Sequence, residues 1–169
     1  MENTPEIKKP YDFILPNLAV GSFESRLDPN FLAVVTIISP SEMRYISQSF
    51  PITTPAKHLM MIPIHDGEMG MTPYFDNAFQ FIETHIENGK VLVHCHAGIS
   101  RSVSMVIYYL SKKMNMHPID ASKIVRKKRV IADPYSGFMS EIITRYVAEK
   151  MEKAKQPEPT EGMVILTEK

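Results

Sequence analysis

One stretch, KVLVHCHAGISRSV at residues 90–103, restricts the fold of this chain most strongly. It opens with β-branched and apolar residues typical of a buried strand, passes through a short loop around Gly98, and continues from Arg101 with apolar residues at helical spacing. A strand, a tight loop and a helix in succession are typical of α/β folds, which bind ligands at the carboxyl end of a strand. The stretch also holds Cys95, the only cysteine of the chain.

The rest of the chain alternates between strand-like and helix-like segments. Apolar runs predict strands at 31–39 and 58–66, with Asp66 either at the C-terminal end of the second strand or on the loop after it. Apolar periodicity predicts helices at 72–88, 101–114, 118–129 and 138–150. This alternation predicts an α/β fold with a central mixed sheet flanked by helices on both faces.

The length of 169 residues fits one domain with loose ends. We expect residues 11–153 to form the domain. Residues 1–10 are expected to be a flexible N-terminal arm, because they are polar and end in proline. Residues 154–169 contain two prolines and mixed charges, so a flexible C-terminal tail is expected there.

Composition excludes several classes of protein. Lys plus Arg and Asp plus Glu number 19 each, so the chain has no global basic field for nonspecific binding of nucleic acid or anionic lipid. No apolar run approaches the length of a membrane-spanning helix, and a single cysteine cannot form an intramolecular disulfide. We therefore expect a cytoplasmic protein, with the nucleus as an alternative, and no nucleic-acid or membrane partner. The sequence indicates no oligomeric state.

The loop after the strand has the features of an anion site. Backbone N–H groups at a helix start, together with the positive end of the helix dipole, bind phosphate. Arg101 adds a planar guanidinium that can hold two phosphoryl oxygens, and Gly98 supplies the backbone freedom that a tight loop needs. The expected phosphate-binding loop comprises His96, Ala97, Gly98, Ile99, Ser100 and Arg101.

Cys95 lies at the base of this loop. Helix amides and a nearby arginine lower the pKa of a thiol from about 8.5 to roughly 3.5–7.5, so a thiolate is expected. A thiolate beneath a bound phosphorus can attack it and form a phosphocysteine that water then cleaves. A lone cysteine on an apolar strand is more often a small buried hydrophobe. Four further residues at fixed spacing favour the catalytic interpretation, namely His94, Gly98, Arg101 and Ser102.

The pattern H-C-x-x-G-x-x-R-S, here HCHAGISRS, resembles the signature of the cysteine-dependent protein tyrosine phosphatase superfamily. The segment AGISRS looks most like its dual-specificity branch. The similarity extends over about residues 11–150, through ILPNLAVGS, IPIHD, YFDNAFQFI and DPYSGF. The resemblance implies a dual-specificity phosphatase-like fold and a shallow pocket that accepts phosphotyrosine and phosphoserine or phosphothreonine.

The resemblance also implies roles for single residues. His94 would orient the loop and tune the thiolate, and Ser102 would hydrogen-bond Cys95 as it leaves the phosphoenzyme. His96 occupies a variable position of the family, so no catalytic role is expected for its side chain. No His or Asp cluster has metal-ligand spacing, and we expect neither a metal nor a cofactor.

A general acid must protonate the departing oxygen, because an alkoxide or phenoxide is a poor leaving group. Asp66, in HDGEMG, matches the mobile acid loop of the family in order and spacing. Asp133, in DPY, resembles the acid of low-molecular-weight tyrosine phosphatases, but DPYSGF matches the turn before the last helix of the dual-specificity branch. We therefore expect Asp66 to be the acid. Glu68 is a weaker substitute, and Asp76 is expected on a solvated helix face.

Arg129 ends the charge run RKKR at 126–129. It matches a family position near the pocket mouth, where a basic group can meet a second phosphate on the substrate. The alternative is a solvated helix end, which is the usual interpretation of a charge run.

The expected function is hydrolysis of phosphotyrosine and phosphoserine or phosphothreonine, with a phosphorylated protein as the partner. Two alternatives stay open: a phosphate-binding scaffold without turnover, and a phosphatase of inositol lipids or RNA 5′ ends on the same fold. The presence of Cys95, Arg101 and Asp66 disfavours the scaffold. A loop without lysine and a net charge of zero disfavour the lipid and RNA substrates. The segment 39–57 departs from the family pattern, and its role is left open.

Overall fold

Five strands form one mixed sheet in the computed structural model, which describes residues 9–51 and 53–157. The strands lie in the order β1-β2-β5-β3-β4. Their bounds are β1 Tyr11–Leu15, β2 Leu18–Gly21, β3 Phe31–Ile37, β4 His58–Ile62 and β5 Lys90–His94. β1 pairs antiparallel with β2, whereas β2, β5, β3 and β4 run parallel. The predicted α/β class with a central mixed sheet is therefore confirmed.

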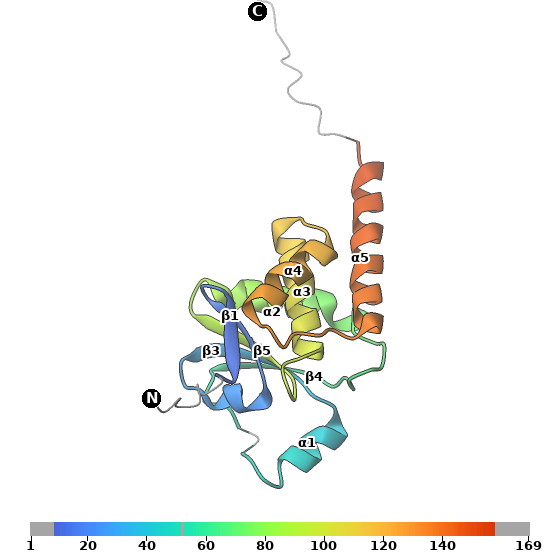
Figure 1. Ribbon diagram of the computed structural model, residues 1–169. Coiled ribbons are helices and arrows are strands. Elements are labelled where there is room, and N and C mark those ends of the chain that lie inside the picture. The colour runs from blue at the N-terminus through green and yellow to red at the C-terminus, as the bar shows by residue number, and fades with distance from the viewer. Residues whose placement is uncertain (1–8, 52, 158–169) are drawn as a thin grey trace, which may run out of the picture.

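The described part of the chain contains five α-helices and two short 3-10 helices. Their bounds are η1 Phe23–Leu27, α1 Pro40–Ile46, η2 Thr72–Tyr74, α2 Phe75–Ile86, α3 Arg101–Met114, α4 Pro118–Lys128 and α5 Ser136–Lys155. α2, α3 and α4 pack against the sheet, and α3 also packs against α5, the long helix at the right of Figure 1.

The central strand β5 is buried on both faces of the sheet. Val91 and Val93 join the large core under the helices, whereas Leu92 joins a smaller core on the opposite face. η1 contacts β3 and β5, and its Arg26 lies close enough to His94 to influence the charge of that ring. Helices therefore cover both faces, as predicted, with the short η1 on the second face. Burial on both faces explains why the strand is a continuous apolar run.

The loop between β5 and α3 has rigid elements on both sides. β5 ends at His94 and α3 begins at Arg101, as the sequence predicts. Apolar side chains such as Ile107 and Leu110 bury α3 along most of its length. The helix ends where Asn115 adopts the left-handed conformation, with a φ of 50°. The positions of the loop ends are therefore set by the core.

Two predicted elements differ from the observed ones. The strand predicted at 58–66 ends at Ile62, because Pro63 has no N–H with which to continue the ladder. Asp66 therefore lies on the loop that follows. The helix predicted at 72–88 begins with the 3-10 turn η2 before α2.

The ends of the chain bear on the predicted boundaries. α5 continues to Lys155, so the expected C-terminal tail begins inside its last turn. Residues 1–8 and 158–169, which hold most of the expected arm and tail, lie outside the described residues. Within the described ranges, no helix is long and apolar enough to cross a membrane.

Candidate active site

The loop after β5 turns its carbonyl groups outward. Four successive carbonyl oxygens accept hydrogen bonds from outside the loop. The donor and acceptor pairs are Phe23 N with His96 O at 3.0 Å, Arg129 Nη2 with Ala97 O at 3.4 Å, Arg129 Nε with Gly98 O at 2.6 Å, and Asp133 N with Ile99 O at 2.8 Å. The N–H groups of the same four loop residues donate to no backbone acceptor in the described part of the chain. Successive free N–H groups of this kind form an anion-binding nest.

Gly98 makes this loop geometry possible. Its φ of 67° lies in the left-handed region that favours glycine. A Cβ at this position would come within 2.5 Å of the carbonyl carbon of Gly21. The prediction that the tight loop needs a glycine here is therefore confirmed on both counts.

Cys95 is buried and lines a pocket of about 190 Å³. The other residues that line this pocket are Glu42, Asp66, His96, Ala97, Ile99, Ser100 and Arg101. Cys95 Sγ lies 3.2 Å from Ser102 Oγ, so the hydroxyl can donate to the sulfur. The structure thus brings the predicted nucleophile, the predicted acid and most of the predicted loop into one cavity.

Arg101 presents one edge of its guanidinium without a partner. Nη1 donates to Glu42 Oε2 at 2.6 Å and to Ile64 O at 2.9 Å, and Nη2 donates to Glu42 Oε1 at 2.8 Å. The buried Nε has no hydrogen-bond partner among the described residues. Nε and the second N–H of Nη2 lie on the same edge of the planar group, which is the fork that holds two phosphate oxygens.

The charge of Arg101 is kept despite its burial. Burial lowers the pKa of the guanidinium, but the hydrogen bonds to Glu42 and the charges of Cys95, Glu42 and Asp66 outweigh it and raise the pKa overall. The side chain is therefore a fixed cation in the wall of the pocket.

Glu42 is a site residue that the sequence interpretation missed. Ser39 caps α1 in a reciprocal capping box, in which Glu42 N–H donates to Ser39 Oγ at 3.3 Å and Ser39 N–H donates to Glu42 Oε2 at 3.0 Å. Burial opposes ionisation of Glu42, but hydrogen bonds from Arg101 and Ser39 lower its pKa to about 2. The S-x-x-E spacing at 39–42 signals a helix start. Nothing local signals the ion pair with Arg101.

His94 lies directly beneath the loop, with 0% of its surface exposed. Its Nδ1 lies 3.0 Å from Cys95 O, and its Nε2 lies 2.7 Å from Thr36 Oγ1. Because a carbonyl only accepts, Nδ1 must donate, and Nε2 is left to accept from the threonine hydroxyl. Burial is the main cause that lowers the pKa of His94 to about 4, and the charges of Arg26 and Arg101 add to it. The neutral ring therefore holds the peptide of Cys95 in place.

The candidate acids occupy different positions. Asp66 lies on the exposed loop after β4 and lines the pocket of Cys95. Asp133 and Glu68 are exposed and are not among the residues that line this pocket. Asp76 pairs with Arg145 at 2.5 Å, which is the main cause that lowers its pKa. Only Asp66 of the four lies where it can reach a group bound at Cys95.

Arg129 is buried, so the interpretation of this residue as part of a solvated helix end is wrong. Arg126, Lys127 and Lys128 are exposed, but Arg129 is only 3% exposed. Its guanidinium donates to two carbonyls of the loop and pairs with Asp12 Oδ2 at 2.8 Å. It therefore braces the loop from outside the pocket, and this position gives no support to the expected contact with a second phosphate.

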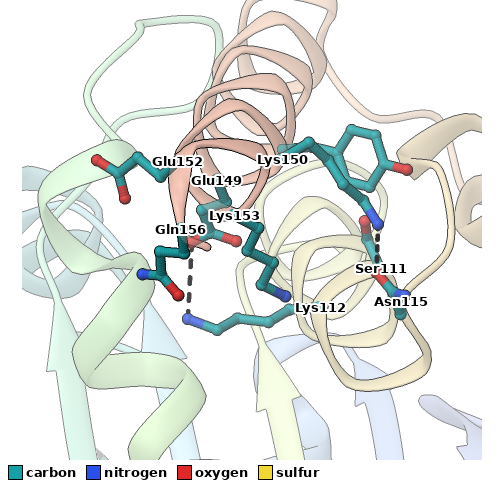
Figure 2. A pocket seen from close by; sticks show the side chains of 9 residues that line it. Ser111, Lys112, Asn115, Glu149, Lys150, Glu152, Lys153 and Gln156 are labelled. Carbon is teal, nitrogen blue, oxygen red and sulfur yellow. Dashed lines mark hydrogen bonds and ion pairs between the residues drawn. The ribbon is translucent and has the colours of Figure 1, made fainter. Parts of the chain in front are cut away.

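A separate hollow of about 300 Å³ lies between α3 and α5 (Figure 2). Its lining is mainly lysine and glutamate, together with Ser111 and Tyr146. Lys150 Nζ donates to Asn115 Oδ1 at 2.6 Å, and Lys112 Nζ lies 3.7 Å from Glu149 Oε1. These contacts tie the two helices together, and no residue of the predicted site lines this hollow.

A family model described as the catalytic domain of dual specificity phosphatases matches residues 30–147. Tyrosine-protein phosphatase vhp-1 of Caenorhabditis elegans is 32% identical over 132 residues, which cover 77% of this chain and 20% of that protein. Dual specificity protein phosphatase 5 of Rattus norvegicus is 30% identical over 148 residues, which cover 86% of this chain and 38% of that protein. The chain thus spans less than half the length of these curated relatives.

The crystal structure of the human tyrosine phosphatase-like serine/threonine/tyrosine-interacting protein matches the fold with a TM-score of 0.74. The two sequences are 26% identical, and the match covers 83% of this chain and 97% of that one. The family match includes β5, the loop around Cys95 and most of the helices that hold it. On its sequence, its fold and its pocket, the chain belongs to the dual specificity phosphatase catalytic-domain family.

Proposed function

We propose that this protein hydrolyses phosphate esters on phosphorylated proteins, with Cys95 as the nucleophile. The arrangement around the sulfur carries the proposal. Free N–H groups of the loop and the unpartnered edge of Arg101 surround the pocket that contains Cys95. Both sets of donors match the oxygens of a phosphoryl group, and together they hold its phosphorus above the thiol.

In the first step, the Cys95 thiolate attacks phosphorus and the bond between phosphorus and the substrate oxygen breaks. Asp66 gives its proton to that oxygen as it departs. In the second step, water attacks the phosphocysteine and gives a proton to the Asp66 carboxylate. The bond between sulfur and phosphorus breaks, and the Ser102 hydroxyl, 3.2 Å from the sulfur, stabilises the returning thiolate.

His94 acts in this scheme as a positioning residue. Its Nδ1–H holds the carbonyl of Cys95, and its own ring is fixed by Thr36. Arg129 positions the loop from the other side through two carbonyls. With their carbonyls held outward, the loop residues keep their N–H groups directed at the phosphate throughout the reaction.

The proposed substrates are phosphotyrosine and phosphoserine or phosphothreonine in proteins. The family match supports this class, and the curated relatives are named as tyrosine and dual specificity protein phosphatases. All groups assigned to the chemistry belong to the chain itself, so we propose a reaction that needs no metal. We place the protein in the cytoplasm, with the nucleus as the alternative.

The test measures phosphate release from an aryl phosphate and from phosphotyrosine and phosphothreonine peptides, in EDTA. Wild type should be active on all three, Cys95→Ser should be inactive, and Asp66→Ala should lose about 10²–10⁴-fold on the peptides, the usual contribution of a general acid. Asp133→Asn is the matched control, because its carboxylate lies outside the pocket. Phosphopeptide binding without turnover by wild type would favour the scaffold instead.

A further inference from the structure

The carboxylate of Glu141, on α5, binds the chain at the end of the acid loop. It accepts hydrogen bonds from four donors in three consecutive residues. The donors are Gly70 N at 3.2 Å, Met71 N at 3.2 Å, Thr72 N at 3.0 Å and Thr72 Oγ1 at 2.8 Å. Glu141 is 8% exposed. This one side chain thus satisfies N–H groups at the start of η2, the short helix that leads into α2.

Among the described residues, no backbone hydrogen bond holds residues 65–69 of the loop that carries Asp66. Every residue from 65 to 70 is exposed, whereas Ile64 and Met71 on either side are buried. On the near side, Ile64 O accepts from Nη1 of Arg101 at 2.9 Å. On the far side, the hydrogen bonds of Glu141 are the anchor. The loop is therefore a short exposed bridge between the catalytic arginine and Glu141.

The negative charge of Glu141 suits it to anchor the end of the loop through these hydrogen bonds. Burial raises the pKa of the carboxyl, but the hydrogen bonds from Thr72, Gly70 and Met71 outweigh it and lower the pKa. No basic side chain pairs with Glu141 among the described ion pairs, so its negative charge is directed entirely at the loop end. Glutamine in its place would turn an NH₂ group toward N–H donors, and at least one donor would lose its partner.

We propose that Glu141 is a positioning residue for the general acid, which it serves by fixing the end of the loop that carries Asp66. This inference rests on the proposed function. The residue touches no substrate. Its hydrogen bonds keep the loop in the arrangement in which the Asp66 carboxyl reaches the leaving oxygen.

The experiment compares kcat/KM for a series of aryl phosphates whose leaving groups have increasing pKa. Protonation by Asp66 makes the rate nearly independent of leaving-group pKa, and its loss makes the dependence steep. Glu141→Gln should react at the wild-type rate with the best leaving group. With the poorest leaving group it should react about tenfold or more slowly, because it loses part of the 10²–10⁴-fold acceleration that a general acid contributes. Glu149→Gln, on the same helix but paired with Arg145, should keep the wild-type dependence.

A double variant separates positioning from a purely structural role. If Glu141 acts through Asp66, the leaving-group dependence of Asp66→Ala with Glu141→Gln should equal that of Asp66→Ala alone. A structural defect would instead lower the rate equally for all leaving groups, and that result would overturn the inference. If Glu141→Gln does not fold, Thr72→Val is the second variant, because it removes the shortest of the four hydrogen bonds. It should steepen the dependence of kcat/KM on leaving-group pKa in the same direction. An unchanged dependence would overturn the inference.

The two proposals fail in different ways. A wild type that releases no phosphate from any aryl phosphate would overturn the proposed function and this inference with it. An active wild type, with an unchanged leaving-group dependence in Glu141→Gln, would overturn only the role of Glu141.

Discussion

Lowering the pH from 7 to 5 should weaken the fold through His94, before most carboxylates are protonated. The folded protein resists protonation of this ring, because burial lowers its pKa to about 4 from an ordinary value of 6.5. The unfolded chain takes up the proton near the ordinary value. His94 therefore leaves the free energy of unfolding unchanged above pH 7 and lowers it progressively as the pH drops below 6.5.

The size of this loss follows from the two pKa values. One pKa unit corresponds to about 1.4 kcal/mol, so the penalty is about 2 kcal/mol at pH 5 and about 3 kcal/mol at pH 4. Glu42, with a pKa of about 2, and the other carboxylates of lowered pKa lose their stabilising effect mainly below pH 4.5. At pH 5 the histidine contribution dominates.

The assay is urea unfolding of wild type and His94→Gln at pH 7 and pH 5. Between pH 7 and pH 5, the free energy of unfolding of wild type should fall by about 2 kcal/mol more than that of the variant. This difference does not depend on how far the substitution itself destabilises the variant at both pH values. His85→Gln is the control. Burial also lowers the pKa of the His85 ring, but this ring is only half-buried, whereas His94 is fully buried. Equal losses in wild type and His94→Gln would contradict this prediction, as would an NMR titration that places the His94 pKa above 6.

Three further predictions concern the pocket. Arg101→Lys should lower kcat/KM for an aryl phosphate by about 10²-fold or more, because a lysine has no planar fork; an activity within threefold would contradict this. Ser102→Ala should slow breakdown of the phosphoenzyme, so stopped-flow should show a burst of phenol release; a linear trace would count against the contact with Cys95. Glu42→Gln should lower the free energy of unfolding by about 1–3 kcal/mol, because the buried Arg101 loses its carboxylate partner. Inorganic phosphate should restore part of this loss as a new counter-ion of Arg101. Thermal unfolding measured with and without phosphate checks this, and no restoration by phosphate would argue against the pairing.

The core of the site was predictable because it is local in the sequence. Cys95, Gly98 and Arg101 lie within seven residues, between a strand and a helix whose apolar spacing is plain. A strand buried on both faces and a helix start allow few paths for the loop that joins them. The position and tight turn of this loop therefore followed from the sequence, including the need for glycine at its turn.

Contacts between distant segments were not predictable in this way. Glu42 reaches Arg101 from α1, and Glu141 reaches the loop that carries Asp66 from the last helix. Each of these carboxylates looks in the sequence like an ordinary helix residue. Their partners are set only when the sheet and helices pack.

Arg129 shows how a local rule is overridden by packing. A run of four basic residues predicts a solvated face, and three of them follow that rule. Arg129 follows the last residue of α4, where the chain turns back toward the loop. Two outward carbonyls and Asp12 supply acceptors for its guanidinium there. Burial of the charge is stabilised by partners that the sequence does not reveal.

Detection of phosphate on Cys95 during turnover would test the proposed mechanism directly. Ser102→Ala would be mixed with a radiolabelled phosphopeptide, quenched in acid within its slow phase and mapped by mass spectrometry. The proposed mechanism predicts one labelled peptide after digestion with trypsin, VLVHCHAGISR, with the phosphate bound through sulfur to Cys95. Phosphate release by wild type, with no label on this peptide at any time in either protein, would contradict the phosphocysteine mechanism.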